Sequence, residues 1–329
     1  MTSSTVLFCA AVVAAVAMAP AGRAAAQVAD YPARTVTIIA PSAPGGLFSL
    51  FARLIATRLE QRLGRAFVVE NKPGAGTVVG ALATIRSQHD GYTLMIANST
   101  TLAINPTLHK ALPYDPGDLA PVMLIARIPQ VLVVNAALPV HSIADLVKLA
   151  KSTPGGLSYG TSGAGTAQHL DAEMLKSVLD IPLTHVPYKG MAPALSDVAG
   201  GHIPMMFCVI PIALPLIQAG KVRMLGVTTT QRIEPIPEVP PLAEIGVPGF
   251  NASTWFMLAA PAKTPHAIVD KLHAELRDFN NDPAVRDELV RQGLMPVASP
   301  PPSELKEFVR SETMRFDRIV RSAGLAGSQ

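Results

Sequence analysis

The chain has 329 residues, of which 49% are hydrophobic and 16% charged, and its formal net charge is +3. This composition can build a large hydrophobic core and two lobes, so it excludes a disordered or fibrous protein. The basic residues are scattered without a basic run, which argues against a nucleic-acid-binding protein.

The first 26 residues are typical of a secretory signal peptide. An apolar run from Val6 to Ala19 precedes small residues that end in Ala24-Ala25-Ala26, a suitable cleavage site before Gln27. At about 14 residues, the run is short for a membrane span. Cys9 would leave with this segment, so Cys208 would have no partner for an internal disulfide. We therefore expect a soluble protein that is exported.

The first strand of the mature chain ends in a glycine turn. Thr35 to Ile39 is rich in β-branched residues, and from Leu50 to Leu63 apolar residues recur at helical spacing. Between them, Pro44 removes a backbone donor, and Gly45 and Gly46 permit positive φ and the close approach of a ligand. The amides that open the helix can hold an anion or a carboxylate, and an ordinary connection between strand and helix is the alternative.

Alternating strands and helices continue after this turn. A strand at Ala66 to Glu70 is followed by a helix at Val78 to Ser87 and a strand at Thr93 to Ala97, which ends in Asn98 to Thr101. This order predicts a parallel α/β sheet, whose ligands bind at the carboxyl ends of the strands. The glycines from Gly74 to Gly80 are one residue too widely spaced for a dinucleotide fingerprint, so we expect no cofactor.

A long apolar stretch from Leu119 to Ala137, broken at Pro129, predicts a crossing into a second lobe. There, strands are expected at residues 157–159, 183–186, 203–209 and 222–228, and helices at 142–151, 167–179, 192–199 and 212–219. The proline-rich residues 233–249 are interpreted as an extended surface segment, and Thr254 to Ala259 as a return strand to the first lobe. Helices are then expected at residues 265–279, 283–292 and 302–322.

These elements predict an α/β protein of two lobes joined by two hinge crossings. We assign residues 27–129 and 256–329 to lobe 1, and residues 130–255 to lobe 2. Such a clamp places its ligand in the cleft between the lobes and buries it on closure.

A second glycine turn lies in lobe 2. The strand at residues 157–159 runs into Gly160-Thr161-Ser162-Gly163-Ala164-Gly165-Thr166, and a helix begins near Ala167. The glycines expose backbone amides, the hydroxyls can donate, and the helix presents its amino end. Two such turns facing each other predict a cradle for a carboxylate.

Catalytic and metal sites are the weaker interpretations. Ser162 lies between Gly160 and Ala164, so the nucleophile-elbow motif G-x-S-x-G fails at its last position. His169 follows seven residues later on a helix and is better suited to capping than to general-base catalysis. The histidines show no metal-binding spacing. We expect no catalytic residue and no metal.

Three further residues are less specific candidates. Tyr188 follows the strand at residues 183–186, and Cys208 ends the strand at residues 203–209, so both lie at carboxyl ends in lobe 2. Cys208 can equally be a small buried apolar residue. Trp255 in the return strand is better explained by core packing than by contact with a ligand.

The ordered motifs resemble those of the Bug-type solute receptors of tripartite tricarboxylate transporters. The resemblance extends from about Tyr31 to Leu325 and includes Tyr31-Pro32-x-Arg34, Ala43-Pro44-Gly45-Gly46, Val69-Glu70-Asn71-Lys72-Pro73-Gly74-Ala75-Gly76, Asp90-Gly91-Tyr92-Thr93-Leu94, Asn105-Pro106, Leu112-Pro113-Tyr114-Asp115, Ser162-Gly163-x-Gly165-Thr166-x-x-His169, His185-Val186-Pro187-Tyr188-Lys189-Gly190 and Trp255-Phe256.

This resemblance implies a periplasmic receptor with the two-lobed type II binding-protein fold, which passes a small organic anion to membrane permease subunits. We expect it to act as a monomer. Carried over by position, the carboxylate would be held by backbone amides, hydroxyls and ordered water. The candidate ligand-binding residues are Gly45, Gly46, Leu47, Phe48, Ser49, Ser99, Thr100, Thr161, Ser162, Gly163, Gly165, Thr166, His169, Tyr188 and Cys208.

Two departures from the family pattern bear on the choice of ligand. The family usually has Gly-Gly-Ser-Thr-Asp in the first turn, where this chain has Leu47, Phe48 and Ser49 after the glycines. It usually has Phe-Asp-Asn or Phe-Asp-Ser where this chain has Phe207-Cys208-Val209. A site without these acids gains little from a ligand ammonium group. We therefore expect a mono- or dicarboxylate with an apolar or aromatic body, and not an amino acid.

Two alternatives to a transport receptor remain at this point. One is a ligand-sensing subunit that docks on a membrane signalling protein. The other is a periplasmic hydrolase that uses Ser162 and His169.

Overall fold

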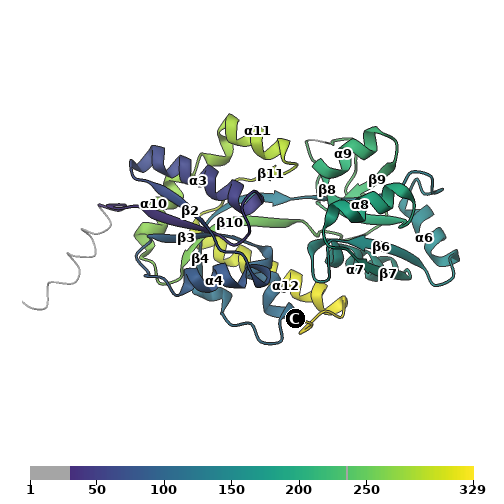
Figure 1. Cartoon of the computed structure of the whole chain (residues 1–329), viewed down its shortest axis with the longest axis horizontal. Coiled ribbons are helices and arrows are strands. Elements are labelled where there is room, and N and C mark those ends of the chain that lie inside the picture. Colours follow the sequence, from purple (N-terminus) through teal and green to yellow (C-terminus); the bar gives the residue numbers. More distant parts are fainter. Residues whose placement is uncertain (1–29, 235) are drawn as a thin grey trace, which may run out of the picture.

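The computed structural model describes residues 30–234 and 236–329, so the expected signal peptide and Cys9 lie outside the described residues. Figure 1 shows two α/β lobes side by side, each built on its own sheet. None of the helices in these described ranges is long and apolar enough to cross a membrane.

The sheet of lobe 1 has the strand order β11-β4-β10-β3-β1-β2. Strand β1 pairs in parallel with β2 and β3, as the alternating pattern predicts, whereas β10 is antiparallel to both β3 and β4. The return strand is therefore a central strand of this sheet. The strands are β1 (Val36–Ala40), β2 (Phe67–Asn71), β3 (Thr93–Asn98), β4 (Leu119–Ile128), β10 (Thr254–Pro261) and β11 (Met295–Pro296).

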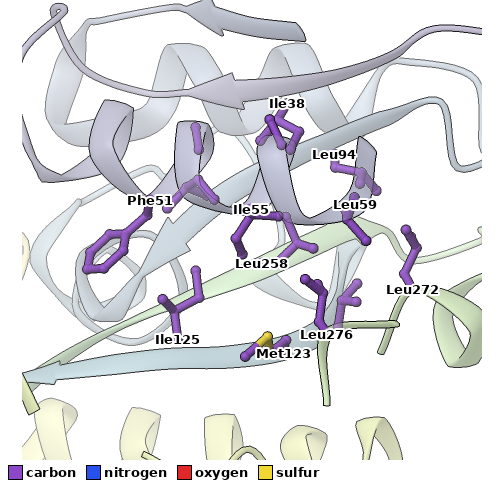
Figure 2. Close-up of a cluster of buried hydrophobic side chains, with 14 of the residues drawn as sticks. Ile38, Phe51, Ile55, Leu59, Leu94, Met123, Ile125, Leu258, Leu272 and Leu276 are labelled. Carbon is purple, nitrogen blue, oxygen red and sulfur yellow. The ribbon is translucent and has the colours of Figure 1, made fainter. Parts of the chain in front are cut away.

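Helices cover both faces of this sheet. On one face, α3 (Leu47–Leu63), α10 (His266–Leu276) and α11 (Pro283–Arg291) bury apolar side chains against the strands. Figure 2 shows this core, with Phe51, Ile55 and Leu59 of α3 above Ile125 and Leu258. On the other face, α4 (Val78–Ile85) and α12 (Pro302–Ser322) enclose a second core that includes Trp255, which is fully buried. Core packing of Trp255 is thus confirmed.

The sheet of lobe 2 has the strand order β7-β6-β8-β5-β9. Strand β6 is parallel to β7 and β8, and β5 is antiparallel to β8 and β9. The strands are β5 (Gln130–Asn135), β6 (Leu157–Thr161), β7 (Leu183–Pro187), β8 (Met205–Val209) and β9 (Val222–Val227), and the helices are α6 (Ile143–Ser152), α7 (Ala167–Leu179), α8 (Met191–Gly200) and α9 (Ile210–Gln218). The hydroxyl of Ser142 accepts a hydrogen bond from the amide of Asp145 and caps α6.

The chain crosses between the lobes twice. Pro129 separates β4 of the first sheet from β5 of the second, and residues 228–253 lead from β9 back to β10. We propose that the lobe boundaries lie at these crossings, near residues 130 and 255. In Figure 1, α12 of lobe 1 extends below the junction toward α7 of lobe 2.

Three local expectations were wrong. Helix α3 begins at Leu47 and not at Leu50. A π-helix (Thr100–Ile104) and α5 (Asn105–Leu108) follow β3, where no helix was expected. The proline-rich segment 233–249 is not confined to the surface, because it buries a set of apolar side chains in lobe 2: Ile233, Ile236, Val239, Leu242 and Val247.

Candidate ligand-binding site

The first glycine turn connects β1 to the amino end of α3. Gly45 has φ of +93°, as glycine permits, but Gly46 has φ of −87° and ψ of 179°, so the positive φ that glycine allows is used at Gly45 and not at Gly46. Gly46 is the residue that precedes the helix, and it provides no side-chain cap. The first intrahelical bond runs from the amide of Leu50 to the carbonyl of Gly46, at 3.0 Å. The amides of Leu47, Phe48 and Ser49 are therefore not used by the helix itself.

The side chains of this turn pack against the core of lobe 1 to different depths. Leu47 and Phe48 are half-buried, and the ring of Phe48 meets that of Phe256 edge-on with centroids 4.7 Å apart. Ser49 is fully buried, and its hydroxyl accepts a hydrogen bond of 2.6 Å from the side-chain amide of Asn71. The hydroxyl of Ser49 thus ties the turn to Asn71, while Leu47 and Phe48 supply the apolar surface of the turn.

Asn71 was not recognised as a site residue from the sequence. Its side-chain amide also donates to the carbonyl of Ser42, at 2.9 Å, so it holds the turn at two points. The parallel pairing of Ala40 with Asn71 places the ends of β1 and β2 side by side. The sequence alone does not give the order or register of the strands, so it could not show that Asn71 lies beside the first turn.

Ser99 and Thr100 follow β3, the other neighbour of β1. Thr100 is half-buried and opens the π-helix. Ser99 is fully buried, and among residues 30–234 and 236–329 its hydroxyl has no hydrogen-bond partner. The two residues therefore lie at the same edge of the sheet as the first turn, with Thr100 the more accessible of the pair.

The second turn is held by its own hydroxyl groups. The hydroxyl of Thr161 accepts from the amide of Gly163 at 3.1 Å, and the hydroxyl of Thr166 donates to the carbonyl of Gly163 at 2.8 Å. Gly163 and Gly165 have φ of +136° and +73°, which favours glycine at both positions. Thr166 precedes α7 without a side-chain cap, and the first intrahelical bond runs from Leu170 to its carbonyl. This helix also begins with uncapped amides.

A buried chain of hydrogen bonds joins this turn to the first hinge crossing. Ser162 donates to the side-chain carbonyl of Gln168 at 2.8 Å, and the amide of Gln168 donates to Gln130 at 2.9 Å. Gln130 in turn donates to Asp171 at 2.7 Å. Burial raises the pKa of Asp171 well above its usual value. Gln168, Gln130 and Asp171 were not identified from the sequence, because residues 38 and 41 positions apart in the chain come together only in the fold.

His169 lies under the second turn with its ring neutral. Its Nδ1 accepts from the amide of Gly165 at 3.0 Å, and its ring stacks on that of His185 with centroids 3.8 Å apart. Burial, followed by the neighbouring His185, lowers the pKa of His169 to about 4. Ser162 donates to Gln168 rather than to His169, so the serine–histidine pair of the hydrolase interpretation is not formed.

We expect His169 to contribute a loss of stability as the pH drops from about 6.5 toward about 4, whereas the raised pKa of Asp171 acts in the opposite direction and is present in wild type and His169 variants alike. In this window the unfolded chain binds a proton at position 169 that the folded chain does not, so acid favours unfolding. Urea titrations at pH 7 and pH 5 should therefore show that lowering the pH is less destabilising for His169→Gln than for the wild type. The exposed His202 provides the control, and His202→Gln should behave as the wild type. An equal acid sensitivity in His169→Gln would contradict the assignment.

Tyr188 and Cys208 differ in their access to the second turn. The amide of Tyr188 donates to the carbonyl of Thr161 at 3.0 Å, and its hydroxyl donates to Asp197 at 2.6 Å, so it borders the turn. Cys208 is fully buried in the core of lobe 2, and burial raises the pKa of its thiol to about 12. Cys208 is thus a neutral packing residue beneath the strand end.

The two turns belong to lobes that meet at several points. Val209, at the end of β8, packs against the core of lobe 1 that also contacts Phe48. A Cβ atom added at Gly165 would lie 3.3 Å from a methyl group of Leu108 in lobe 1. Among the residues with described positions, no group of three or more His, Cys, Asp or Glu is arranged to hold a metal ion. The chemistry offered is therefore backbone amides and hydroxyls at uncapped helix ends, with an apolar edge.

Comparisons with known proteins give a consistent result. The family model for the tripartite tricarboxylate transporter family receptor matches residues 51–325. Protein BugT of Bordetella pertussis is 35% identical over 310 residues, which cover 93% of this chain and 95% of BugT.

Two solved structures from Rhodopseudomonas palustris are similar over most of their length. Rpa4515 with adipate is 36% identical with a TM-score of 0.77, and the match covers 90% of this chain and 99% of that one. MatC (Rpa3494) with bound malate is 30% identical with a TM-score of 0.72, and the match covers 88% of this chain and all (100%) of that one. The expected two-lobed α/β fold is confirmed by these matches.

Proposed function

We propose that this protein captures a small organic carboxylate between its lobes and delivers it to membrane permease subunits, because the chain belongs to the tripartite tricarboxylate transporter receptor family. The resemblance to Bug-type receptors is thereby confirmed, and the family consists of solute-binding receptors rather than enzymes. The hydrolase interpretation finds no support in this family or in the hydrogen bonds of Ser162.

One observation carries the proposal of a carboxylate clamp. Helices α3 and α7, one in each lobe, begin after glycine turns without a side-chain cap. Their first amides can donate to a carboxylate, and the helix dipole favours negative charge there. Fixed amides replace the hydration of the anion without a buried counter-charge. The residues proposed to contact the ligand are Gly45 to Ser49 and Thr161 to Thr166, with Thr100 and Tyr188 at the borders.

The edge of the first turn suggests the body of the ligand. Leu47 and Phe48 present half-buried apolar surface, and residues 45–49 and 161–166 of the two turns include no acidic side chain. An aliphatic or aromatic body would bury apolar area against Leu47 and Phe48, which contributes about 25 cal/mol per Å². Among the similar structures, Rpa4515 holds adipate, a dicarboxylate with a chain of methylene groups. We therefore propose a mono- or dicarboxylate with an apolar body.

Calorimetric titration of the mature protein with adipate, benzoate, malate, aspartate and glutamate tests this ligand class. We expect adipate or benzoate to bind and to raise the melting temperature, because a ligand at a hundredfold excess over its Kd stabilises the folded state by about 2.7 kcal/mol. Leu47→Ser removes apolar surface without touching the amides, so it should weaken binding of the apolar acid and leave that of malate nearly unchanged. Binding of aspartate or glutamate alone would contradict the proposed class.

Delivery to a permease is tested separately from capture. A strain lacking this gene should lose uptake of the bound acid, and the wild-type copy should restore it. If uptake is unchanged but transcription in response to the acid is lost, the protein would be a sensor subunit and not a transport receptor.

A further inference from the structure

A polar cavity lies at the hinge, apart from the two glycine turns. It has a volume of about 320 Å³, and we call it the hinge crevice. It is lined by residues of lobe 1 and of the second crossing: Arg127, Thr229, Thr230, Gln231, Asn251, Ser253, Met295, Pro296 and Val297. Some of these lining residues belong to β11, an edge strand of the lobe 1 sheet, and others follow β9, an edge strand of the lobe 2 sheet. The two glycine turns instead follow β1 and β6. The hinge crevice and the proposed clamp therefore lie on opposite sides of the crossing strands.

Arg127 is the charged group of the hinge crevice. It is half-buried near the end of β4, between its partners Met295 in β11 and Trp255 in β10. Its guanidinium lies 5.5 Å from the ring centroid of Phe308, and its Nη1 donates to the hydroxyl of Ser253 at 3.3 Å. A guanidinium has five donors, so this single long bond leaves most of its capacity unused.

The surroundings of Arg127 carry a surplus of positive charge. Within residues 30–234 and 236–329, no carboxylate lies within ion-pair distance of its guanidinium. The nearby carboxylate of Glu312 is already held by Arg315 and by the indole of Trp255. Burial lowers the pKa of Arg127, with Glu312 opposing and Arg315 adding to the shift. A half-buried cation of this kind gains free energy from any anion that reaches it.

We propose that the hinge crevice binds a small oxyanion, a carboxylate or a phosphate group, on the guanidinium of Arg127. The fork of the guanidinium matches two oxygens of such a group. Thr230, Gln231 and Asn251 line the same cavity, and a hydroxyl or side-chain amide from these residues could donate to the remaining oxygens. An ion held there contacts lobe 1 and the second crossing at once, so it would join parts of the chain that move relative to one another on hinge closure.

Titration calorimetry at constant ionic strength tests the hinge crevice, with inorganic phosphate and acetate as separate probes. We expect one of the probes to bind the wild type, and Arg127→Gln to weaken that binding by about tenfold or more, because a charge-assisted hydrogen bond contributes about 1.5–3 kcal/mol. Arg65 is exposed and distant in sequence from the crevice, so Arg65→Gln serves as the matched control. Arg127→Lys should retain part of the affinity. Unchanged binding in Arg127→Gln, or no binding of either probe to the wild type at millimolar concentration, would overturn the proposal.

Two further measurements separate this site from the clamp and from a loss of folding. Gly46→Asp places a negative charge in the first glycine turn, so binding at the hinge crevice should survive it, and loss of phosphate or acetate binding in that variant would assign the ion to the clamp. Wild-type crystals soaked in selenate should show anomalous density beside the guanidinium of Arg127. Density only at the glycine turns would exclude the hinge crevice without any variant.

Discussion

Gly46→Asp is expected to abolish binding of the carboxylate ligand while the protein stays folded. Gly46 has an extended backbone with φ of −87°, which aspartate adopts without strain, and an added Cβ would lie 3.8 Å from its nearest neighbour, the hydroxyl of Ser42. Aspartate is a favoured residue at this position, and its carboxylate would accept from the free amides of α3. The side chain would thus occupy the place of the ligand carboxylate.

Gly46→Asp is expected to weaken ligand binding and, at the same time, to stabilise the folded protein. Loss of two charge-assisted hydrogen bonds, at about 1.5–3 kcal/mol each, weakens binding by more than about a hundredfold. The new cap should raise the free energy of unfolding by roughly a few tenths of a kcal/mol. Gly46→Ala fits the same space without a cap and should bind nearly as the wild type does. Calorimetry and urea unfolding measure the two quantities, and unchanged affinity in Gly46→Asp would remove the first turn from the site.

Arg315→Ala is expected to cost about 3 kcal/mol of stability, since it leaves a buried carboxylate without its partner. The side chains of Arg315 and Glu312 are only 15% and 9% exposed. Arg315 also donates to the carbonyls of Asn251 and Ser253, at 2.6 and 3.0 Å, and so fixes the second crossing where it enters β10. Its removal therefore affects both a buried ion pair and the hinge backbone.

The single tryptophan of the chain reports this change directly, because the indole of Trp255 donates to Glu312 at 2.7 Å. Urea unfolding followed by its fluorescence should give a lower midpoint for Arg315→Ala. The double variant Arg315→Met with Glu312→Gln removes both charges and should recover part of the loss. A cost below about 1 kcal/mol for Arg315→Ala, as for a surface pair, would contradict the buried network.

Local patterns in the sequence predicted most elements of the fold. The bounds of α7 and α12 agree with their helical periodicity, and Ser142 caps α6 as its position indicated. The break at Pro129 correctly marked the passage between sheets, because proline lacks the donor that a continuous central strand needs. These features depend on neighbours in the chain, so one sequence suffices to predict them.

Features that depend on distant partners were missed or misjudged. The conformation of Gly46 is set by the helix that starts at Leu47, and a Gly-Gly pair alone does not show which of its members takes positive φ. Asn71 and Gln130 gained their roles only through sheet register and the crossing. The proline-rich segment was assigned to the surface because prolines suggest a loop, yet apolar residues at about every third position of it are buried in lobe 2.

The position of β10 between β3 and β4 has a consequence for the order of folding. All strands of the lobe 2 sheet lie in one continuous segment, residues 130–227, so they are all available once residue 227 has been synthesised. Lobe 1 has a gap in the middle of its sheet until residues 254–261 arrive, because β3 and β4 do not pair with each other. A chain that emerges from its amino end would therefore assemble lobe 2 first, while the exposed edges of β3 and β4 wait for their partner. We therefore expect the lobe that begins the sequence to complete its fold last.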